Sequence, residues 1–206
     1  MVVYLILGIT FGFACAVQPG PFQTFIISRT LSNGWRHTLP VAFAPLMSDG
    51  PIIILVLLVL NSVPIWMEHF LHFAGGFFVL FLAIGALRSF KNYDLNKTVL
   101  LQSRRQNFIK AATVNLLNPN VYLAWSLVMG PLIMKGWREN PGNGVALIMG
   151  FYITMILITV GIIILIAASR KLGPKVNRTL IGISAIALAC FGIYQLWLGA
   201  MALWFK

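Results

Sequence analysis

Two proline motifs and one carboxylate stand inside apolar stretches of this sequence, where polar chemistry is rare. The motif Gln-Pro-Gly-Pro at residues 18–21 interrupts the first apolar run, and Asn118-Pro119 interrupts a later one. A proline in a helix interior removes a backbone donor and clashes with the preceding turn, at a cost of about 3 kcal/mol or more. Asp49 lies in a third apolar run. Backbone groups freed by the breaks, together with one carboxylate, can bind a small charged molecule.

Each proline motif predicts that a new helix begins inside its apolar run. Asn is a favoured N-cap and Pro is favoured at the first helical position, as in Asn118-Pro119. Gly20-Pro21 fits the same pattern, with Gly20 tolerating an unusual backbone conformation. The N-terminal end of such a half-helix has unpaired N–H groups and about half a positive charge, so it can bind a carboxylate. The prolines also free carbonyl groups, predicted at Cys15, Val17 and Asn115, which can accept hydrogen bonds from an ammonium group.

Asp49 is the only carboxylate well inside an apolar run. A charged Asp at the centre of a membrane helix costs about 2.5–3.5 kcal/mol on insertion scales, so such residues usually face a cavity and have a function. It can act as a counter-ion for an ammonium group, as a proton carrier, or as both; the alternative is a neutral Asp hydrogen-bonded to a neighbouring helix. Asp49 is the candidate for proton coupling. The candidate substrate-binding residues are Gln18, Pro19, Gly20, Pro21, Asp49, Asn115, Asn118 and Pro119.

The elements that carry these residues are membrane spans. The chain of 206 residues is 59% hydrophobic and 9% charged, whereas a soluble domain has about 25% charged residues. A bilayer-spanning helix needs about 20 mostly apolar residues. We predict an all-α membrane protein with six transmembrane helices, of which the first and the fourth are broken. The six runs are 2–28, 39–62, 70–90, 109–134, 144–169 and 179–204.

The Lys and Arg residues are distributed unevenly between the connections. Twelve of them, including Arg29 and Lys110, fall after the first, third and fifth spans, and three fall on the other side. The positive-inside rule therefore places the basic connections in the cytoplasm and both termini outside. The net charge of +11 is explained by this topology. Nucleic-acid binding is not expected, because no basic patch with interleaved aromatic residues lies outside the spans.

Six spans divide into two halves of three, so the second half must be inserted upside down relative to the first. This is the architecture of inverted-repeat transporters. Gln18-Pro19 matches Asn118-Pro119, and Asn33-Gly34-Trp35 matches Lys135-Gly136-Trp137. Both proline motifs lie about 15 Å from the cytoplasmic ends of their spans, near the midplane. We predict one transmembrane transporter domain over 1–206, with a first repeat at 1–90, a cytoplasmic loop at 91–108 and a second repeat at 109–206.

Other polar residues give weaker indications. Glu68, His69 and His72 cluster after the second span, but they have no Cys or further His with which to complete a typical metal site. Cys15 and Cys190 lie in separate apolar runs, and the sequence has no Cys-x-x-Cys pair. Hydrolase triads, phosphate-binding glycine loops and zinc motifs are not found. We expect no enzymatic activity, no cofactor and no bound metal.

Together the motifs resemble those of the LysE/RhtB family of amino-acid exporters. The resemblance rests on Pro19-Gly20-Pro21, Gly34, Asp49 and Asn118-Pro119, and on the glycines of the third span such as Gly75-Gly76. It implies export of amino acids or related small metabolites across a bacterial cytoplasmic membrane, in exchange for protons.

The second span departs from the family pattern. The family usually has glycines before its Asp, whereas this chain has Pro40, Ala44, Pro45 and Ser48. We therefore expect the second span to bend differently, and the sequence does not identify the substrate.

The expected partners are an amino acid as small-molecule substrate, protons and the lipid bilayer. Self-association into a homo-oligomer is left open, and so are two other functions. One is a metal-ion exporter, which would need further His or Asp residues in the spans. The other is a membrane thiol–disulfide electron carrier, which would resemble this chain only if cysteines stood where Gln18 and Asn118 precede the prolines.

Overall fold

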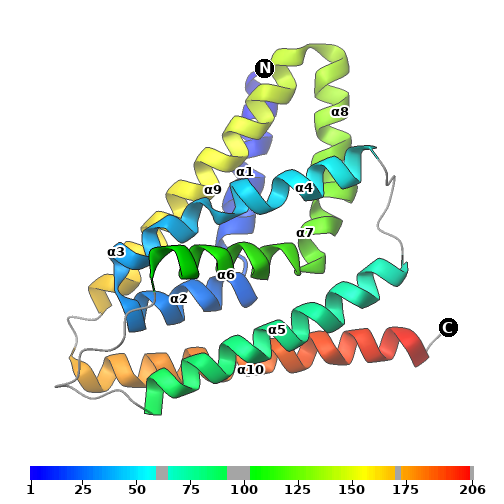
Figure 1. The fold of residues 1–206 in the computed structure, drawn as a ribbon. Helices are drawn as coiled ribbons and strands as arrows, with labels where there is room; N and C mark the ends of the chain where they lie inside the picture. The colour runs from blue at the N-terminus through cyan, green and yellow to red at the C-terminus, as the bar shows by residue number, and fades with distance from the viewer. Residues whose placement is uncertain (59–64, 92–102, 170–172, 205–206) are drawn as a thin grey trace.

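The computed structural model describes all residues except 59–64, 92–102, 170–172 and 205–206. Within the described residues every regular element is a helix (Figure 1). Four helical stretches are long and apolar enough to cross a membrane, and two bent helix pairs raise the number to six when each pair counts as one span. The predicted all-α, six-span fold is confirmed.

The first span is broken at the Gln-Pro-Gly-Pro motif. Helix α1, Val2–Val17, ends before the motif, and α2, Pro21–Asn33, begins within it at an angle of 62° to α1. Pro21 occupies the first helical position, as predicted. Gly20 is the N-cap residue, but its φ of −172° is extended backbone that any residue adopts, and a Cβ there would meet no atom within 4 Å. The prediction of an unusual backbone at Gly20 is therefore wrong.

The fourth span is broken in the same way. Helix α6, Arg104–Leu116, is followed by α7, Pro119–Ala124, and the two directions differ by 60° across the break. The span continues through one π-helical turn, η2 (Trp125–Met129), into α8, Gly130–Glu139. The side chain of Asn118 caps α7, as the sequence predicted.

The second span begins with a tight bend. Gly34 joins α2 to the short helix α3, Trp35–Thr38, with a positive φ of 83°. A 3-10 helix, η1 (Leu39–Phe43), then leads into α4, Ala44–Leu58, which carries Asp49. The positive φ at Gly34 lies in the left-handed region that favours glycine.

The remaining spans are α5, Ile65–Lys91; α9, Pro141–Ser169; and α10, Pro174–Trp204. Helices α5 and α10 lie side by side, and so do α1 and α9 (Figure 1). Helix α6 packs against α4.

Small residues let α1 and α9 approach closely. A Cβ at Gly8 would collide with the backbone of Leu147, and a Cβ at Gly12 would collide with the backbone of Phe151. On α9, a Cβ at Gly150 would lie 2.7 Å from a backbone oxygen of α1. Close backbone approach through small residues is a common way to pack membrane helices.

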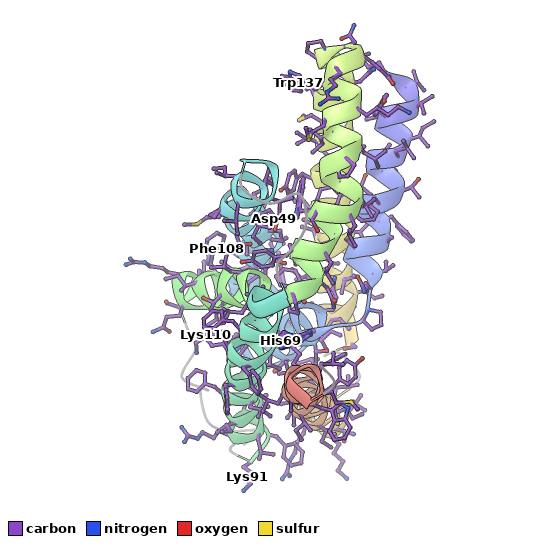
Figure 2. The ribbon with its side chains drawn as sticks, turned by 90° about the vertical axis from the view of Figure 1, so that its right-hand side faces the viewer. Asp49, His69, Lys91, Phe108, Lys110 and Trp137 are labelled. Atoms are coloured by element: carbon purple, nitrogen blue, oxygen red, sulfur yellow. The ribbon has the colours of Figure 1, made fainter. Side chains whose placement is uncertain are left out.

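Helix α2 lies at the centre of the protein, and eleven of its 13 residues are buried. Arg29 is one of these, with 4% of its surface exposed. The sequence predicts Arg29 in a connection between spans, whereas the structure places it inside α2. Along the molecule, Trp137 and Lys91 lie at opposite ends, and Asp49 lies between them (Figure 2).

We predict that Gly34→Ala lowers the thermal stability of the protein. A left-handed φ costs a residue with a side chain about 1–3 kcal/mol, and the midpoint of thermal unfolding in detergent measures this loss. The control is Gly161→Ala in α9, where a Cβ would meet no atom within 4 Å. Equal unfolding midpoints for the two variants would contradict the prediction.

Candidate functional site

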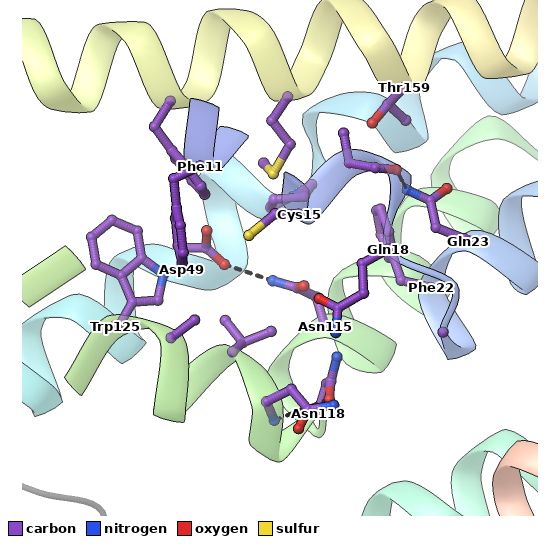
Figure 3. Close-up of a pocket in the computed structure, with 18 of the residues that line it drawn as sticks. Phe11, Cys15, Gln18, Phe22, Gln23, Asp49, Asn115, Asn118, Trp125 and Thr159 are labelled. Atoms are coloured by element: carbon purple, nitrogen blue, oxygen red, sulfur yellow. Dashed lines mark hydrogen bonds between the residues drawn. The ribbon is translucent and has the colours of Figure 1, made fainter. Parts of the chain in front are cut away.

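A pocket lies where the breaks of the first and fourth spans face each other (Figure 3). Its volume is about 800 Å³, including open space at its mouth. The walls come from the end of α1, the start of α2, α4, the α6–α7 break, η2 and α9. Seven of the eight predicted residues line it, and Pro119, although buried, does not. The seven are Gln18, Pro19, Gly20, Pro21, Asp49, Asn115 and Asn118.

Asp49 is held by side chains from two other spans. Its exposed fraction is 3%. The amide of Asn115 donates to Asp49 Oδ1 at 2.6 Å and lies 2.8 Å from Ser48 Oγ, and the hydroxyl of Tyr152 donates to Asp49 Oδ2 at 3.1 Å. Charged acceptors make hydrogen bonds roughly twice as strong as neutral ones. This network connects α4 to α6 and α9, and it includes Ser48, one of the residues at which the second span departs from the family pattern.

An aromatic wall stands beside the carboxylate. The π-helical turn η2 places Trp125 next to Asp49 (Figure 3). Its ring lies 5.8 Å from that of Phe151 and 6.4 Å from that of Tyr152, and the rings of Phe11 and Phe151 are 6.0 Å apart. π-Helical turns inside α-helices are frequent at functional sites. One side of the pocket is therefore apolar and the other polar.

The two half-helix N-termini at the pocket differ in their capping. Asn118 Oδ1 accepts a hydrogen bond from the backbone N–H of Asn120 at 3.1 Å, so α7 is capped by its own chain. No side chain of the described residues caps α2. Pro21, Phe22 and Gln23, the first three residues of α2, all line the pocket. The sequence suggested equal roles for the two ends, whereas the structure leaves only the end of α2 without a side-chain cap.

Side chains and backbone near the α6–α7 break satisfy carbonyl groups that the break exposes. The Asn115 carbonyl, predicted to be free, accepts the backbone N–H of Asn118 at 3.2 Å. The next carbonyl, at Leu116, accepts the hydroxyl of Tyr122 at 2.9 Å. In a membrane interior an unsatisfied carbonyl costs several kcal/mol, so these hydrogen bonds stabilise the break.

Gln23 has the corresponding role at the first break. Its Nε2 donates to the carbonyl of Ala16, across the gap between α2 and α1. Its Oε1 is buried and has no hydrogen-bond partner among the described residues. Gln23 also lines the pocket. Gln23 is not among the eight residues that the sequence predicts to bind the substrate.

Sequence reasoning also missed Trp125, Phe11 and Tyr152. Aromatic residues are common in membrane spans, so nothing in the sequence distinguishes Trp125 or Phe11 from packing residues. Tyr152 carries a hydroxyl inside the long apolar run of α9, and that was the one available signal. Only the packing of α9 against α4 and η2 shows that this hydroxyl meets Asp49.

The two alternative functions, metal-ion export and thiol–disulfide electron transfer, depend on His, Glu and Cys side chains. Within the described part of the chain, no group of three or more His, Cys, Asp or Glu side chains lies close enough to hold a metal ion. The side chain of Glu68 lies outside the described side chains, and His69 and His72 belong to α5. Cys15 and Cys190 are free thiols: Cys15 lines the pocket, and Cys190 is exposed on α10.

A family model described as LysE type translocator matches residues 13–199 of the chain. The matched region contains both proline motifs and Asp49, and therefore the whole network around the carboxylate. No curated protein and no solved structure matches the chain.

We predict that Tyr152→Phe lowers the free energy of unfolding by about 1 kcal/mol, because it removes one donor to a buried carboxylate and leaves the ring in place. Denaturation in detergent measures the effect. Tyr194→Phe is the matched control, since Tyr194 is 57% exposed on α10. A Tyr152→Phe protein as stable as wild type would contradict the hydrogen bond to Asp49.

Proposed function

This chain belongs to the LysE type translocator family, and on that premise we propose that it exports amino acids or related small metabolites across a bacterial cytoplasmic membrane in exchange for protons. It is a multi-pass membrane protein of a family that translocates small molecules. In this proposal residues 1–206 form one transporter domain of two inverted repeats. The basic connections face the cytoplasm and both termini lie outside.

The observation that carries the proposal is the pairing of one carboxylate with one uncapped helix N-terminus in a single pocket. Asp49 provides a negative charge for the ammonium group of an amino acid. The N-terminal end of α2, which has no side-chain cap, provides N–H donors and a partial positive charge for the carboxylate. Broken helices that bind substrate at the midplane are typical of inverted-repeat transporters.

The composition of the pocket wall favours a neutral and apolar substrate side chain. Among the described residues that line the pocket, Asp49 is the only charged one. A second charge on the substrate would lose its hydration without gaining a partner, and this is costly in a buried site. Apolar residues, including Phe11, Trp125 and Phe151, offer contacts to an aliphatic or aromatic side chain instead.

Asp49 is also the proposed site of proton coupling. Protonation would cancel the charge that holds the ammonium group, and it would therefore weaken substrate binding on the side where protons enter. Among the described residues, the donors to the carboxylate come from α6 and α9. A change in its charge would therefore alter the hydrogen bonds that join α4 of the first half to α6 and α9 of the second half.

We predict that Asp49→Asn abolishes transport while the protein still inserts into the membrane. Asn removes the charge and keeps the size of the side chain, so the variant tests the charge directly. Efflux of amino acids from cells or proteoliposomes measures transport, and membrane fractionation measures insertion. Glu139→Gln is the control, because Glu139 contacts Tyr4 outside the pocket. Normal export by Asp49→Asn would exclude the proposed role.

We predict that amino acids with apolar side chains compete for transport at least tenfold better than those with charged side chains. A tenfold difference corresponds to about 1.4 kcal/mol, less than the cost of burying an unpaired charge. Competition by unlabelled leucine, phenylalanine, lysine and glutamate against labelled leucine in proteoliposomes gives the order. Lysine competing as well as leucine would refute this selectivity and leave the Asp49 proposal standing.

A further inference from the structure

Arg29 is a buried cation that has no anionic partner among the described residues. It lies in the last turns of α2 with 4% of its surface exposed. Its Nε is buried and has no hydrogen-bond partner in the part of the chain that the structure describes. Its guanidinium group lies 5.2 Å from the centre of the Phe25 ring. A buried charge is costly unless it is paired and hydrogen-bonded, so this geometry calls for an anion.

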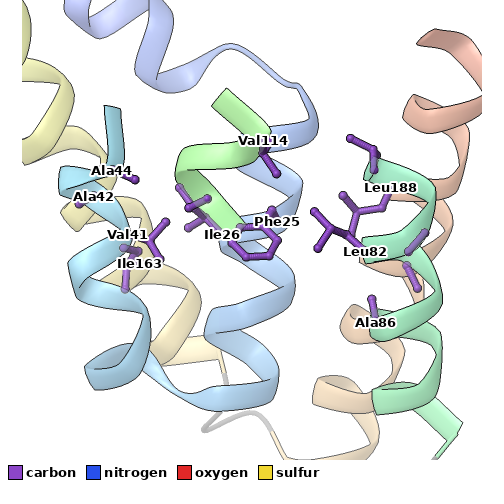
Figure 4. Close-up of a cluster of buried hydrophobic side chains, with 14 residues drawn as sticks. Phe25, Ile26, Val41, Ala42, Ala44, Leu82, Ala86, Val114, Ile163 and Leu188 are labelled. Carbon is purple, nitrogen blue, oxygen red and sulfur yellow. The ribbon is translucent and has the colours of Figure 1, made fainter. Parts of the chain in front are cut away.

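The surroundings of Arg29 leave no described side chain to supply that anion. Phe25 and the neighbouring Ile26 belong to an apolar core between α5 and η1, with Leu82 and Val41 on either side (Figure 4). On α5, a Cβ added to Gly85 would meet a terminal nitrogen of Arg29 at 3.7 Å and no other atom within 4 Å. Glycine at this position therefore leaves space next to the guanidinium group.

A second cation lies close to the first. Lys110 of α6 is near enough to Arg29 for the two charges to repel. Its ammonium lies 5.9 Å from the centre of the Phe81 ring on α5, and that ring is 59% exposed. An oxyanion bound next to Arg29 would also be attracted by the charge of Lys110.

Arg29, Lys110 and Gly85 all lie near the ends of their helices. Arg29 lies one turn from the end of α2, and Lys110 lies less than two turns from the start of α6. Gly85 lies less than two turns from the end of α5 at Lys91. These helix ends carry the basic residues Arg88, Arg104 and Arg105. Arg29 is about 12 Å along α2 from Pro21, and neither Arg29 nor Lys110 lines the central pocket.

We propose that Arg29 and Lys110 form a binding site for an oxyanion between α2, α5 and α6, and that the phosphate of an anionic lipid occupies it. Arg binds phosphate through paired N–H groups in a fixed planar geometry, and Lys adds a second charge. Basic sites between membrane helices on the cytoplasmic side are suited to anionic headgroups. The exposed Phe81 ring next to Lys110 gives the site an approach from the bilayer. This proposal does not rest on the identity of the transported substrate.

The test is the thermal stability of the whole protein in a neutral detergent, with phosphatidylglycerol, phosphatidylcholine or inorganic phosphate added. A ligand that binds only the folded state raises the unfolding midpoint. We expect phosphatidylglycerol to raise the midpoint of the wild type more than phosphatidylcholine does. Arg29→Gln and Lys110→Gln should each lose most of the difference.

Arg178→Gln is the matched control. Arg178 is exposed and lies 5.0 Å from the centre of the Phe90 ring of α5, so it has the same residue type and the same aromatic stacking outside the proposed site. It should keep the full response to phosphatidylglycerol although it changes the net charge equally. If Arg29→Gln does not fold, Arg29→Lys and Lys110→Gln provide the same comparison.

The outcomes separate the alternatives. Equal responses of wild type, Arg29→Gln and Lys110→Gln to phosphatidylglycerol would overturn the site, as would equal stabilisation by the two lipids. Stabilisation of the wild type by inorganic phosphate as strongly as by phosphatidylglycerol, lost in Arg29→Gln, would support an oxyanion site and overturn the lipid as its source. Loss of the response in Arg178→Gln as well would show a general effect of charge and would overturn the site.

Discussion

The interior of a bilayer contains no water to form hydrogen bonds with unpaired backbone groups. The two helix breaks are therefore stable only if the protein itself supplies partners for these groups or encloses them. Each break exposes N–H and C=O groups that would cost several kcal/mol in lipid. The chain satisfies part of them with its own side chains: Gln23 at the first break, and Asn118 and Tyr122 at the second. It leaves others facing a pocket. The breaks are stable because they are enclosed by spans from both halves.

The same enclosure gives the buried carboxylate its environment. Asp49 accepts hydrogen bonds from Asn115 and Tyr152, on α6 and α9, so a charge in the membrane interior connects three spans. Trp125 and its aromatic neighbours keep one side of the pocket apolar. The protein therefore combines a single negative charge, an uncapped helix end and an apolar wall in one cavity, each contributed by a different part of the chain.

The sequence alone predicted the spans and both breaks because their causes are local. Apolar length predicts a spanning helix, and Asn118-Pro119 and Gly20-Pro21 begin helices through capping and a fixed proline φ. Seven of the eight residues predicted to bind the substrate line the pocket. Six of them lie at or near the two breaks. The seventh, Asp49, is an ionisable residue inside a span, and such residues usually face a cavity because burying their charge in lipid is costly. The prediction for Gly20 was wrong because backbone conformation at a cap depends on how the two half-helices are oriented.

What the sequence determined by itself was the membrane fold, the two breaks and the one intramembrane carboxylate, since each follows from the properties of a few adjacent residues. Tertiary structure alone decided which partners these features meet. Tyr152 is 103 positions from Asp49 along the chain, and Arg29 is buried although its neighbours in sequence predicted a connection. Such contacts depend on the packing of spans from opposite halves, and a single sequence has no local pattern that records which faces of two distant helices will touch.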